Sequence, residues 1–305
     1  MCLNTPILFL VFNRLDSTEK VFHQIRRAKP KKLYLSVDGP RDKRKGETEK
    51  CLCVRNIILK QIDWDCELFT NFRDKNLGCK LAISSGIDWF FKNEERGIIL
   101  EDDTLPDLTF FRFCEELLEY YKDDKRLMMI SGDNFQFGRK SAQESYYFSR
   151  YAHIWGWATW RRAWNYYDVD MKIWPKVRNS GLLFNILGDK KEAFYWKSIF
   201  DKVYKGKIDA WSYQWLFACW MQNGLNILPG VNLVSNIGFG SIGTHTKGRS
   251  EVAKLESKEI IFPLFHPIHM KRNALADKFD DKTMFSSKPL YKKIVNKIYG
   301  LLDGS

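Results

Sequence analysis

The stretch GIILEDDTLP (residues 97–106) decides the fold class of this chain. Its first four residues are apolar, three carboxylates follow at once, and Thr-Leu-Pro comes next. A short apolar run that ends in a turn predicts a buried strand of a parallel sheet, and open α/β sheets bind ligands at the carboxyl ends of such strands. The sequence therefore predicts that Glu101, Asp102 and Asp103 lie at the ligand-binding edge of a sheet.

These carboxylates are suited to hold a divalent metal ion. Mg²⁺ and Mn²⁺ prefer oxygen ligands, and they usually take one or two protein carboxylates together with water and substrate phosphate oxygens. A solvated acidic turn is the alternative, since short acidic runs are usually surface features. The position directly behind a strand favours a site at which Mn²⁺ (or Mg²⁺) meets a diphosphate.

Length, composition and charge describe a globular protein with anionic partners. The 305 residues are 45% hydrophobic, enough for one large or two moderate domains, and the formal net charge is +12. Such a charge favours nucleotide sugars, anionic lipids or nucleic acid as partners. We expect no nucleic acid partner, because the chain carries no helix-turn-helix, zinc-finger or RNA-binding motif.

The cysteines and the segments near both ends of the sequence indicate where in the cell the protein is located. Seven scattered cysteines predict reduced thiols, and the apolar stretch at residues 7–12 is too short for a signal sequence or a membrane span. We therefore expect a cytoplasmic protein. Residues 288–302 predict a basic amphipathic helix that can lie on the inner face of a membrane. The alternative is a helix that packs its apolar face on the core.

Alternating elements predict a doubly wound, mostly parallel sheet flanked by helices. Strands are expected at residues 6–12, 32–37, 66–70 and 97–100, with helices at 18–28, 54–61 and 80–91 between them. The remaining expected elements are helices at 110–121, 159–166, 190–204 and 211–223 and strands at 127–131, 146–150, 226–228 and 232–234. We predict a nucleotide-sugar-binding catalytic domain at residues 1–249 and a helical appendage at 250–305.

Polar residues follow the other predicted strands as well. Asn13 and Arg14 come after the first strand, and Asp38 comes after the second. Because the carboxyl ends of parallel strands meet at one edge, we expect a nucleotide-sized crevice there. Arg14 suits a phosphate or base carbonyl, and Asp38 could accept the N3–H of uracil, although capping or surface roles are alternatives for both. No Gly-x-Gly-x-x-Gly follows the first strand, so a dinucleotide site is not expected.

An aromatic-rich segment begins at His153. Trp155 or Trp157 could form the floor of a sugar site, because the apolar C–H groups of a sugar ring suit an aromatic face. We also predict that Trp157 contacts the acceptor. Trp157, Trp160 and Trp164 also fall at helical spacing, which is typical of a stripe that faces the core.

The motifs together resemble GT-A-type glycosyltransferases, in particular the N-acetylglucosaminyltransferase I family and its bacterial relatives. The resemblance spans residues 6–246, and its most specific part is the acidic triplet with Pro106, Asp107 and Phe111 behind it. The shorter matching pieces are Asn13-Arg14, Asp38-Gly39, Trp155-Gly156-Trp157, and Trp211 ahead of Trp215. The resemblance implies the doubly wound GT-A fold.

The resemblance also implies a role for each matching position. These roles are uridine diphosphate binding by Arg14 and Asp38, contact with the ribose and donor sugar by Glu101 and Asp102, Mn²⁺ binding by Asp103, and acceptor binding by Trp211. The family's general base follows that Trp, where this chain has Ser212. Either Asp209 takes over as the base, or Ser212 positions a water or the acceptor.

Residues 235–245 resemble the family's closing loop over the donor. Three glycines within six residues give such a loop backbone freedom, and its N–H groups can contact a diphosphate. We expect Gly240 and Ser241 to bind the donor. His245 would complete the metal sphere or touch phosphate, with an ordinary exposed histidine as the alternative.

The resemblance implies an inverting, metal-dependent glycosyltransferase. It would move a sugar, with N-acetylglucosamine the leading guess, from a uridine diphosphate sugar to a glycan or lipid-linked acceptor. One alternative is a sugar-phosphate nucleotidyltransferase, which needs a Gly-rich loop around a triphosphate that residues 11–14 do not supply. The other is a non-enzymatic basic module that binds a membrane surface or a polyanion.

Overall fold

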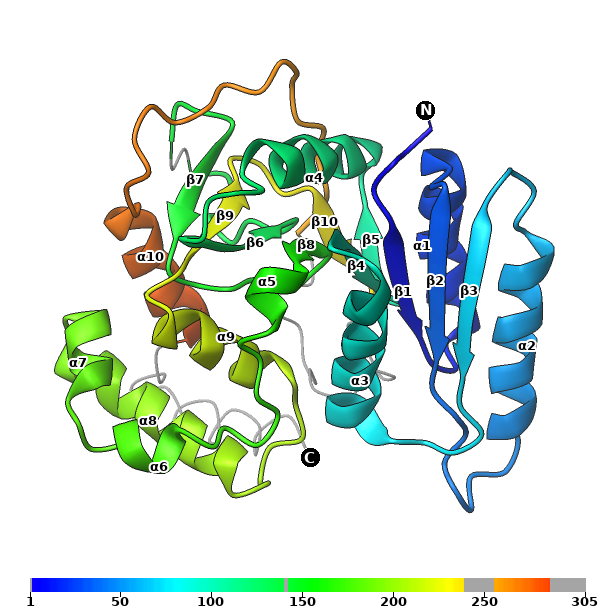
Figure 1. Ribbon diagram of the computed structural model, residues 1–305, viewed down its shortest axis with the longest axis horizontal. Helices are drawn as coiled ribbons and strands as arrows, with labels where there is room; N and C mark the ends of the chain where they lie inside the picture. The colour runs from blue at the N-terminus through cyan, green and yellow to red at the C-terminus, as the bar shows by residue number, and fades with distance from the viewer. Residues whose placement is uncertain (1, 140–141, 239–254, 286–305) are drawn as a thin grey trace, which may run out of the picture.

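The computed structural model describes residues 2–139, 142–238 and 255–285. Within these residues, Figure 1 shows a large twisted sheet with helices on both faces. The strand order of this sheet is β3-β2-β1-β4-β8-β6-β9-β7, and β5 and β10 form a separate antiparallel pair. The pairs among β3, β2, β1 and β4 are all parallel. The predicted α/β class, with a mostly parallel central sheet flanked by helices, is confirmed.

The elements have the following bounds. The strands are β1 (Ile7–Val11), β2 (Lys32–Val37), β3 (Glu67–Phe72), β4 (Arg96–Glu101), β5 (Thr104–Pro106), β6 (Leu127–Ser131), β7 (Tyr146–Ser149), β8 (Trp157–Trp160), β9 (Leu225–Pro229) and β10 (Val234–Asn236). The helices are α1 (Leu15–Ala28), α2 (Glu47–Lys60), α3 (Gly78–Asn93), α4 (Leu108–Tyr120), α5 (Arg161–Trp164), α6 (Trp174–Val177), α7 (Leu182–Leu187), α8 (Lys190–Tyr204), α9 (Ser212–Met221), α10 (Ala274–Asp280) and the π-helical turn η2 (Asp281–Phe285).

The register of the parallel strands brings the predicted polar residues together. Val11 at the end of β1 pairs with Val37 at the end of β2, and Leu10 pairs with Glu101 at the end of β4. The three strands therefore end at the same edge of the sheet. The turns that follow them, with their polar side chains, emerge side by side, as the strand-end rule predicts.

Both faces of the sheet are buried, which explains the continuous apolar runs. In β1, Ile7 and Phe9 pack on one face together with α1, α2 and α4. Leu8 and Leu10 pack on the other face together with α3 and a group of tryptophans. Strands that are covered on both sides need apolar residues at successive positions, as the sequence has here.

The helix predicted at residues 159–166 is confirmed only for Arg161–Trp164. Residues 157–160 form β8, an antiparallel strand between β4 and β6, and only Arg161–Trp164 is helical. Trp157 packs on one face of the sheet, and its neighbour Ala158 packs on the other. The spacing of the tryptophans suggested a helix, but pairing with two central strands decides the conformation.

Residues 255–285 pack against the body of the protein. Ile260 and Leu264 belong to the main core, and the N–H of Ser145 donates to the carbonyl of Phe265. In Figure 1 this segment crosses the sheet end near α4 and leads into α10 beside β7. The predicted boundary at residue 249 lies outside the described residues, as does the whole of the predicted basic helix at residues 288–302. No helix in the described ranges is long and apolar enough to cross a membrane.

Gly97 tests the packing of β4 on α3. A Cβ atom at this position would lie 2.2 Å from the Phe90 ring and 2.9 Å from the carbonyl oxygen of Pro6. We expect Gly97→Ala to lower the free energy of unfolding by about 3 kcal/mol through overpacking, measured by urea denaturation. Phe90→Leu in the same chain should recover part of that loss. A double variant no more stable than Gly97→Ala would contradict the assigned contact.

Candidate functional site

A cavity of about 700 Å³ opens at the carboxyl edge of the sheet. The ends of β1, β2 and β4 form one wall, and the segment before α9 forms another. Of the residues predicted for the site, those that line the cavity are Arg14, Asp38, Glu101, Asp102, Asp103, Asp209, Trp211 and Ser212. The structure therefore brings together residues that lie up to 198 positions apart in the sequence.

The guanidinium of Arg14 lies between two of the carboxylates. Its Nη1 atom is 2.6 Å from Asp103 Oδ2 and 3.2 Å from Asp102 Oδ1. The backbone N–H of Phe12 donates to Asp102 Oδ2 at 3.1 Å. Asp102 is thus held from two sides by the turn after β1, and its side chain is 9% exposed. The Asp103 side chain is more open, at 18%.

Burial and mutual repulsion oppose ionisation of this acidic cluster. Burial, with the charges of Asp103 and Asp102, raises the pKa of Glu101, while the indole N–H of Trp211 favours its ionised form. Burial and the charge of Asp103 also raise the pKa of Asp102, against the opposing effect of Arg14. A cluster of this kind is stabilised by any cation that enters the cavity.

Asp38 holds a neighbouring loop in place. Its Oδ1 accepts from the N–H groups of Gly39 and Leu77 at 3.0 and 3.1 Å, and its Oδ2 accepts from Asn76 Nδ2 at 2.8 Å. These bonds occupy most of the acceptor capacity of the carboxylate. Asp38 borders the cavity as predicted, but its contacts favour support of the loop that leads into α3 over direct contact with a uracil ring.

The cavity wall formed by the segment before α9 carries the candidate base. Asp209 is exposed and lines the cavity, and Ser212 is the first residue of α9. Trp211 lies between them, is 2% exposed, and stacks on Trp157 with ring centroids 5.5 Å apart. A Cβ at Gly78 would lie 3.3 Å from Asp209 Oδ2, so this carboxylate also borders the turn that begins α3.

The aromatic residues divide into cavity and core. Trp155 lines the cavity, as one of the two predicted possibilities. Trp157 is 0% exposed in the core, packed against Trp164, Trp211 and Trp215. The prediction that Trp157 contacts the acceptor or a sugar is therefore wrong for this structure, because its strand lies between two others and its ring points into the tryptophan cluster.

Residues that the sequence reasoning missed complete the walls. The guanidinium of Arg73, directly behind β3, donates to the hydroxyls of Ser36 and Ser85 at 3.1 and 2.9 Å and borders the cavity. The strand-end rule, applied to β3, could have found it. Cys79 also borders the cavity, where burial and nearby carboxylates raise its pKa to about 12, so its thiol stays neutral and is a poor nucleophile.

The predicted closing loop begins at the acids but leaves the described residues. Strand β10 pairs with β5 directly behind the acidic turn, and the N–H of Ile237 donates to the carbonyl of Asp103 at 2.8 Å. Gly238 lines the cavity. Gly240, Ser241 and His245 lie outside the described residues, so their roles stay predictions.

The acidic edge fits a metal ion only if a ligand shares it. No group of three or more His, Cys, Asp or Glu side chains in the described ranges is placed to hold a metal. Asp103 offers hard oxygen atoms on the cavity wall, where a nucleotide diphosphate could supply further oxygens. The donor set therefore suits Mg²⁺ or Mn²⁺ bound jointly by Asp103 and a phosphate group.

Comparison with known proteins gives only remote structural similarity. The chain matches no protein-family model and no curated protein. A UDP-glucose pyrophosphorylase complexed with UDP-glucose is 11% identical at a TM-score of 0.40, covering 74% of this chain and 90% of that one. A UTP-bound UGPase from Acinetobacter baumannii is 7% identical at a TM-score of 0.34, covering 74% and 86%.

A third structure is HddC from Yersinia pseudotuberculosis, at 11% identity and a TM-score of 0.32, covering 52% of this chain and 77% of that one. A resemblance this remote carries no argument about the function of this chain.

Gly238→Ala tests the contact between β10 and the acidic turn. An added Cβ would lie 2.3 Å from Asp103 Oδ2 and 2.8 Å from its Cβ, so the whole Asp103 side chain must move. We expect the dissociation constant of UDP with Mn²⁺, measured by calorimetry, to rise about tenfold, or about 1.4 kcal/mol. Gly230→Ala, outside the cavity, is the control. Equal affinity of both variants would contradict a role for Asp103 in ligand binding.

Proposed function

We propose that this protein is a metal-dependent glycosyltransferase that uses a nucleotide diphosphate sugar. The supporting observation is one cavity with Arg14 and the acidic triplet on one wall and the exposed carboxylate of Asp209 on another. Glycosyl transfer needs a charged site for a diphosphate and a base for an acceptor hydroxyl on opposite sides of the sugar. A cavity of about 700 Å³ has room for both.

Each of three cavity residues has its own role in the proposed reaction. Arg14 binds and orients the diphosphate through its planar guanidinium, and Trp155 offers an aromatic face to a sugar ring. Asp103 holds the divalent cation, which when bound neutralises charge on the departing diphosphate. The resemblance of the sequence motifs to GT-A-type glycosyltransferases supports a uridine diphosphate donor, with N-acetylglucosamine as the leading sugar, and inversion at the anomeric carbon.

The proposed chemical step begins at the acceptor hydroxyl. Its oxygen attacks the anomeric carbon of the donor, and the bond from that carbon to the diphosphate oxygen breaks with the electron pair leaving on the diphosphate. The hydroxyl proton passes to the carboxylate of Asp209. We place the base there because carboxylates are better proton acceptors than the hydroxyl of Ser212.

A second candidate is nucleotidyl transfer onto a sugar phosphate. It shares the nucleotide and metal requirements, and the pyrophosphorylase among the remote structural matches is of this kind. The turn after β1 has the sequence Phe12-Asn13-Arg14 and lacks the glycines that would wrap a triphosphate. Release of pyrophosphate from UTP and a sugar phosphate would favour this candidate over glycosyl transfer.

Donor and metal binding are tested together by thermal shift. A panel of nucleotide sugars with Mn²⁺ should stabilise the protein by about 2.7 kcal/mol when a ligand is present at about 100 times its dissociation constant. Asp103→Asn should abolish the Mn²⁺-dependent part of this gain while its unliganded melting curve stays close to wild type. Equal stability with and without UDP and Mn²⁺ in wild type would favour the non-enzymatic alternative.

Asp209→Asn tests the base. We expect the transfer rate to fall by about 10² to 10⁴ while the affinity for UDP stays unchanged, because the carboxylate acts on the acceptor proton. Ser212→Ala is the matched control on the same wall and should retain most of the rate. The opposite ranking of the two variants would move the base or the acceptor position to Ser212.

A further inference from the structure

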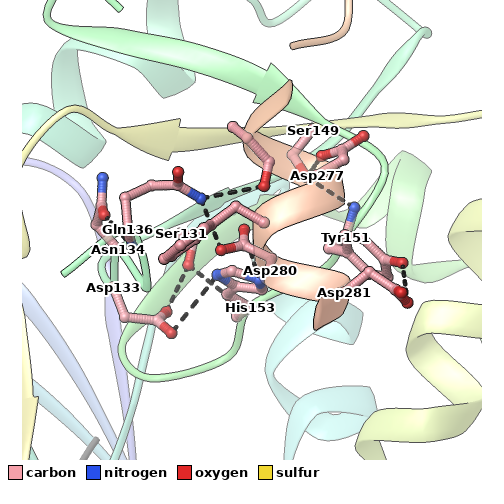
Figure 2. A network of polar contacts seen from close by, with 12 residues as sticks. Ser131, Asp133, Asn134, Gln136, Ser149, Tyr151, His153, Asp277, Asp280 and Asp281 are labelled. Atoms are coloured by element: carbon pink, nitrogen blue, oxygen red, sulfur yellow. Dashed lines mark hydrogen bonds and ion pairs between the residues drawn. The ribbon is translucent and has the colours of Figure 1, made fainter. Parts of the chain in front are cut away.

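A buried polar cluster lies behind the cavity wall and has no part in the proposed reaction (Figure 2). At its centre, the ring of His153 lies between Asp133, which follows β6, and Asp280 at the end of α10. His153 Nδ1 is 3.8 Å from Asp133 Oδ2, and Nε2 is 3.8 Å from Asp280 Oδ2. All three side chains are at most 1% exposed, so their charges and protons have no access to bulk water.

The contacts of Ser131 indicate which groups carry protons. Its Oγ lies 2.7 Å from Asp133 Oδ1 and 2.7 Å from the carbonyl oxygen of His153. A hydroxyl has one hydrogen, so both contacts are satisfied only when Ser131 donates to the carbonyl and a protonated Asp133 donates to Ser131. In agreement, burial raises the pKa of Asp133 to about 7.

The protonation states of His153 and Asp280 can be assigned in the same way. Burial lowers the pKa of His153 to about 3, so the ring is neutral, with one nitrogen that donates and one that accepts. Burial, with the charges of Asp277 and Asp133, raises the pKa of Asp280 to about 8. Both imidazole nitrogens lie 3.8 Å from the facing Oδ2 atoms, which is beyond hydrogen-bonding distance, and none of these four buried atoms has a hydrogen-bond partner within the described residues. Asp280, His153, Asp133 and Ser131 therefore form a chain of close contacts in which only the Asp133–Ser131 contact is a hydrogen bond.

One end of this chain reaches the cavity. The backbone N–H of Trp155 donates to the Asp133 carboxyl, and Trp155 and its neighbour Ile154 line the cavity. Phe135 packs against both His153 and Trp155, with ring centroids 4.6 and 5.0 Å away. A shift of Asp133 or His153 would therefore move this wall.

The other end of the chain reaches the C-terminal segment. Gln136 Nε2 donates to Asp280 Oδ1 at 2.7 Å and to the carbonyl of Ala276 at 3.1 Å. Two further carboxylates dock the same segment independently of His153: Asp277 accepts from Ser149 at 2.6 Å, and Asp281 accepts from Tyr151 at 3.1 Å. Figure 2 shows these contacts distributed around the segment.

We propose that docking of residues 274–285 and the position of the cavity wall at Trp155 are linked through Asp280, His153 and Asp133. The three side chains are positioning residues for the cavity, and α10 with η2 belongs to the functional unit. The proposal goes beyond the reaction proposed above and does not depend on it, because the linkage concerns the protein without ligand.

The linkage has a pH dependence with a definite sign. Exposed aspartates titrate near 4, whereas docking keeps Asp133 and Asp280 protonated, so docking weakens as pH rises toward 7 to 8. Docking also requires neutral His153, and this requirement offsets part of the gain from the two aspartates below about pH 6.5. The other charged groups that face these residues or the same segment are Arg139, Arg150, Glu192, Arg272, Asp277 and Asp281.

Hydrogen exchange of the ligand-free protein, read by mass spectrometry, tests the linkage. We expect Asp280→Ala to speed exchange in peptides that cover both residues 274–285 and residues 150–158. Asn273→Ala, which removes the side-chain cap of α10 and lies outside the His153 chain, is the control and should speed exchange in 274–285 alone. Faster exchange in 274–285 without any change in 150–158 for Asp280→Ala would overturn the proposal.

The pH dependence of the linkage is tested with a double variant that keeps the shape of the cluster around His153. In Asp133→Asn/Asp280→Asn, each amide can donate and accept where the protonated acids do, but it cannot ionise. In wild type, exchange corrected for its intrinsic pH dependence should rise about tenfold in both peptides from about pH 6 to about pH 9. The double variant should show no rise. A rise of wild-type size in the double variant, or none in wild type, would overturn the linkage.

Discussion

The guanidinium of Arg14 is the charge on which the acidic edge of the sheet depends. Unit charges about 4 Å apart interact with about 4 kcal/mol where the effective dielectric constant is near 20, so adjacent carboxylates at a buried strand end repel one another strongly. Arg14 lies within 3.2 Å of both Asp102 and Asp103 and offsets part of that repulsion. The N–H of Phe12 adds a fixed dipole from the same turn. The turn after β1 thus stabilises the acids after β4.

The first half of the fold could be predicted from the sequence because its strands and turns follow a local pattern. Parallel strands with both faces buried need apolar runs, and polar residues can follow only where the strands end, so β1, β2 and β4 and their turns were predicted within one or two residues. The information is local, because each run and its turn are adjacent in the chain. Convergence of the turns then follows from parallel pairing alone.

The rest of the site depends on contacts that no local pattern encodes. Gly238 lies against Asp103 because β10 pairs with β5, a contact between segments more than 120 residues apart. Asp38 was correctly placed at the cavity, but its partners come from the loop before α3 and satisfy the carboxylate within the protein. Trp157, Trp160 and Trp164 fall at helical spacing, but pairing with β4 and β6 places Trp157 and Trp160 in a strand of the sheet.

The protein buries carboxylates in two different environments, one at the cavity of the proposed reaction and one in the cluster that supports the cavity wall. At the cavity, charge on Asp102 and Asp103 is balanced by a side chain that can exchange partners when a phosphate or a cation arrives. Around His153, Asp133 and Asp280 face a neutral imidazole in place of a guanidinium, and burial raises the pKa of both carboxyls. A fully enclosed cluster of this kind can hold a cavity wall in one position without exposing charge to the ligands that the wall encloses.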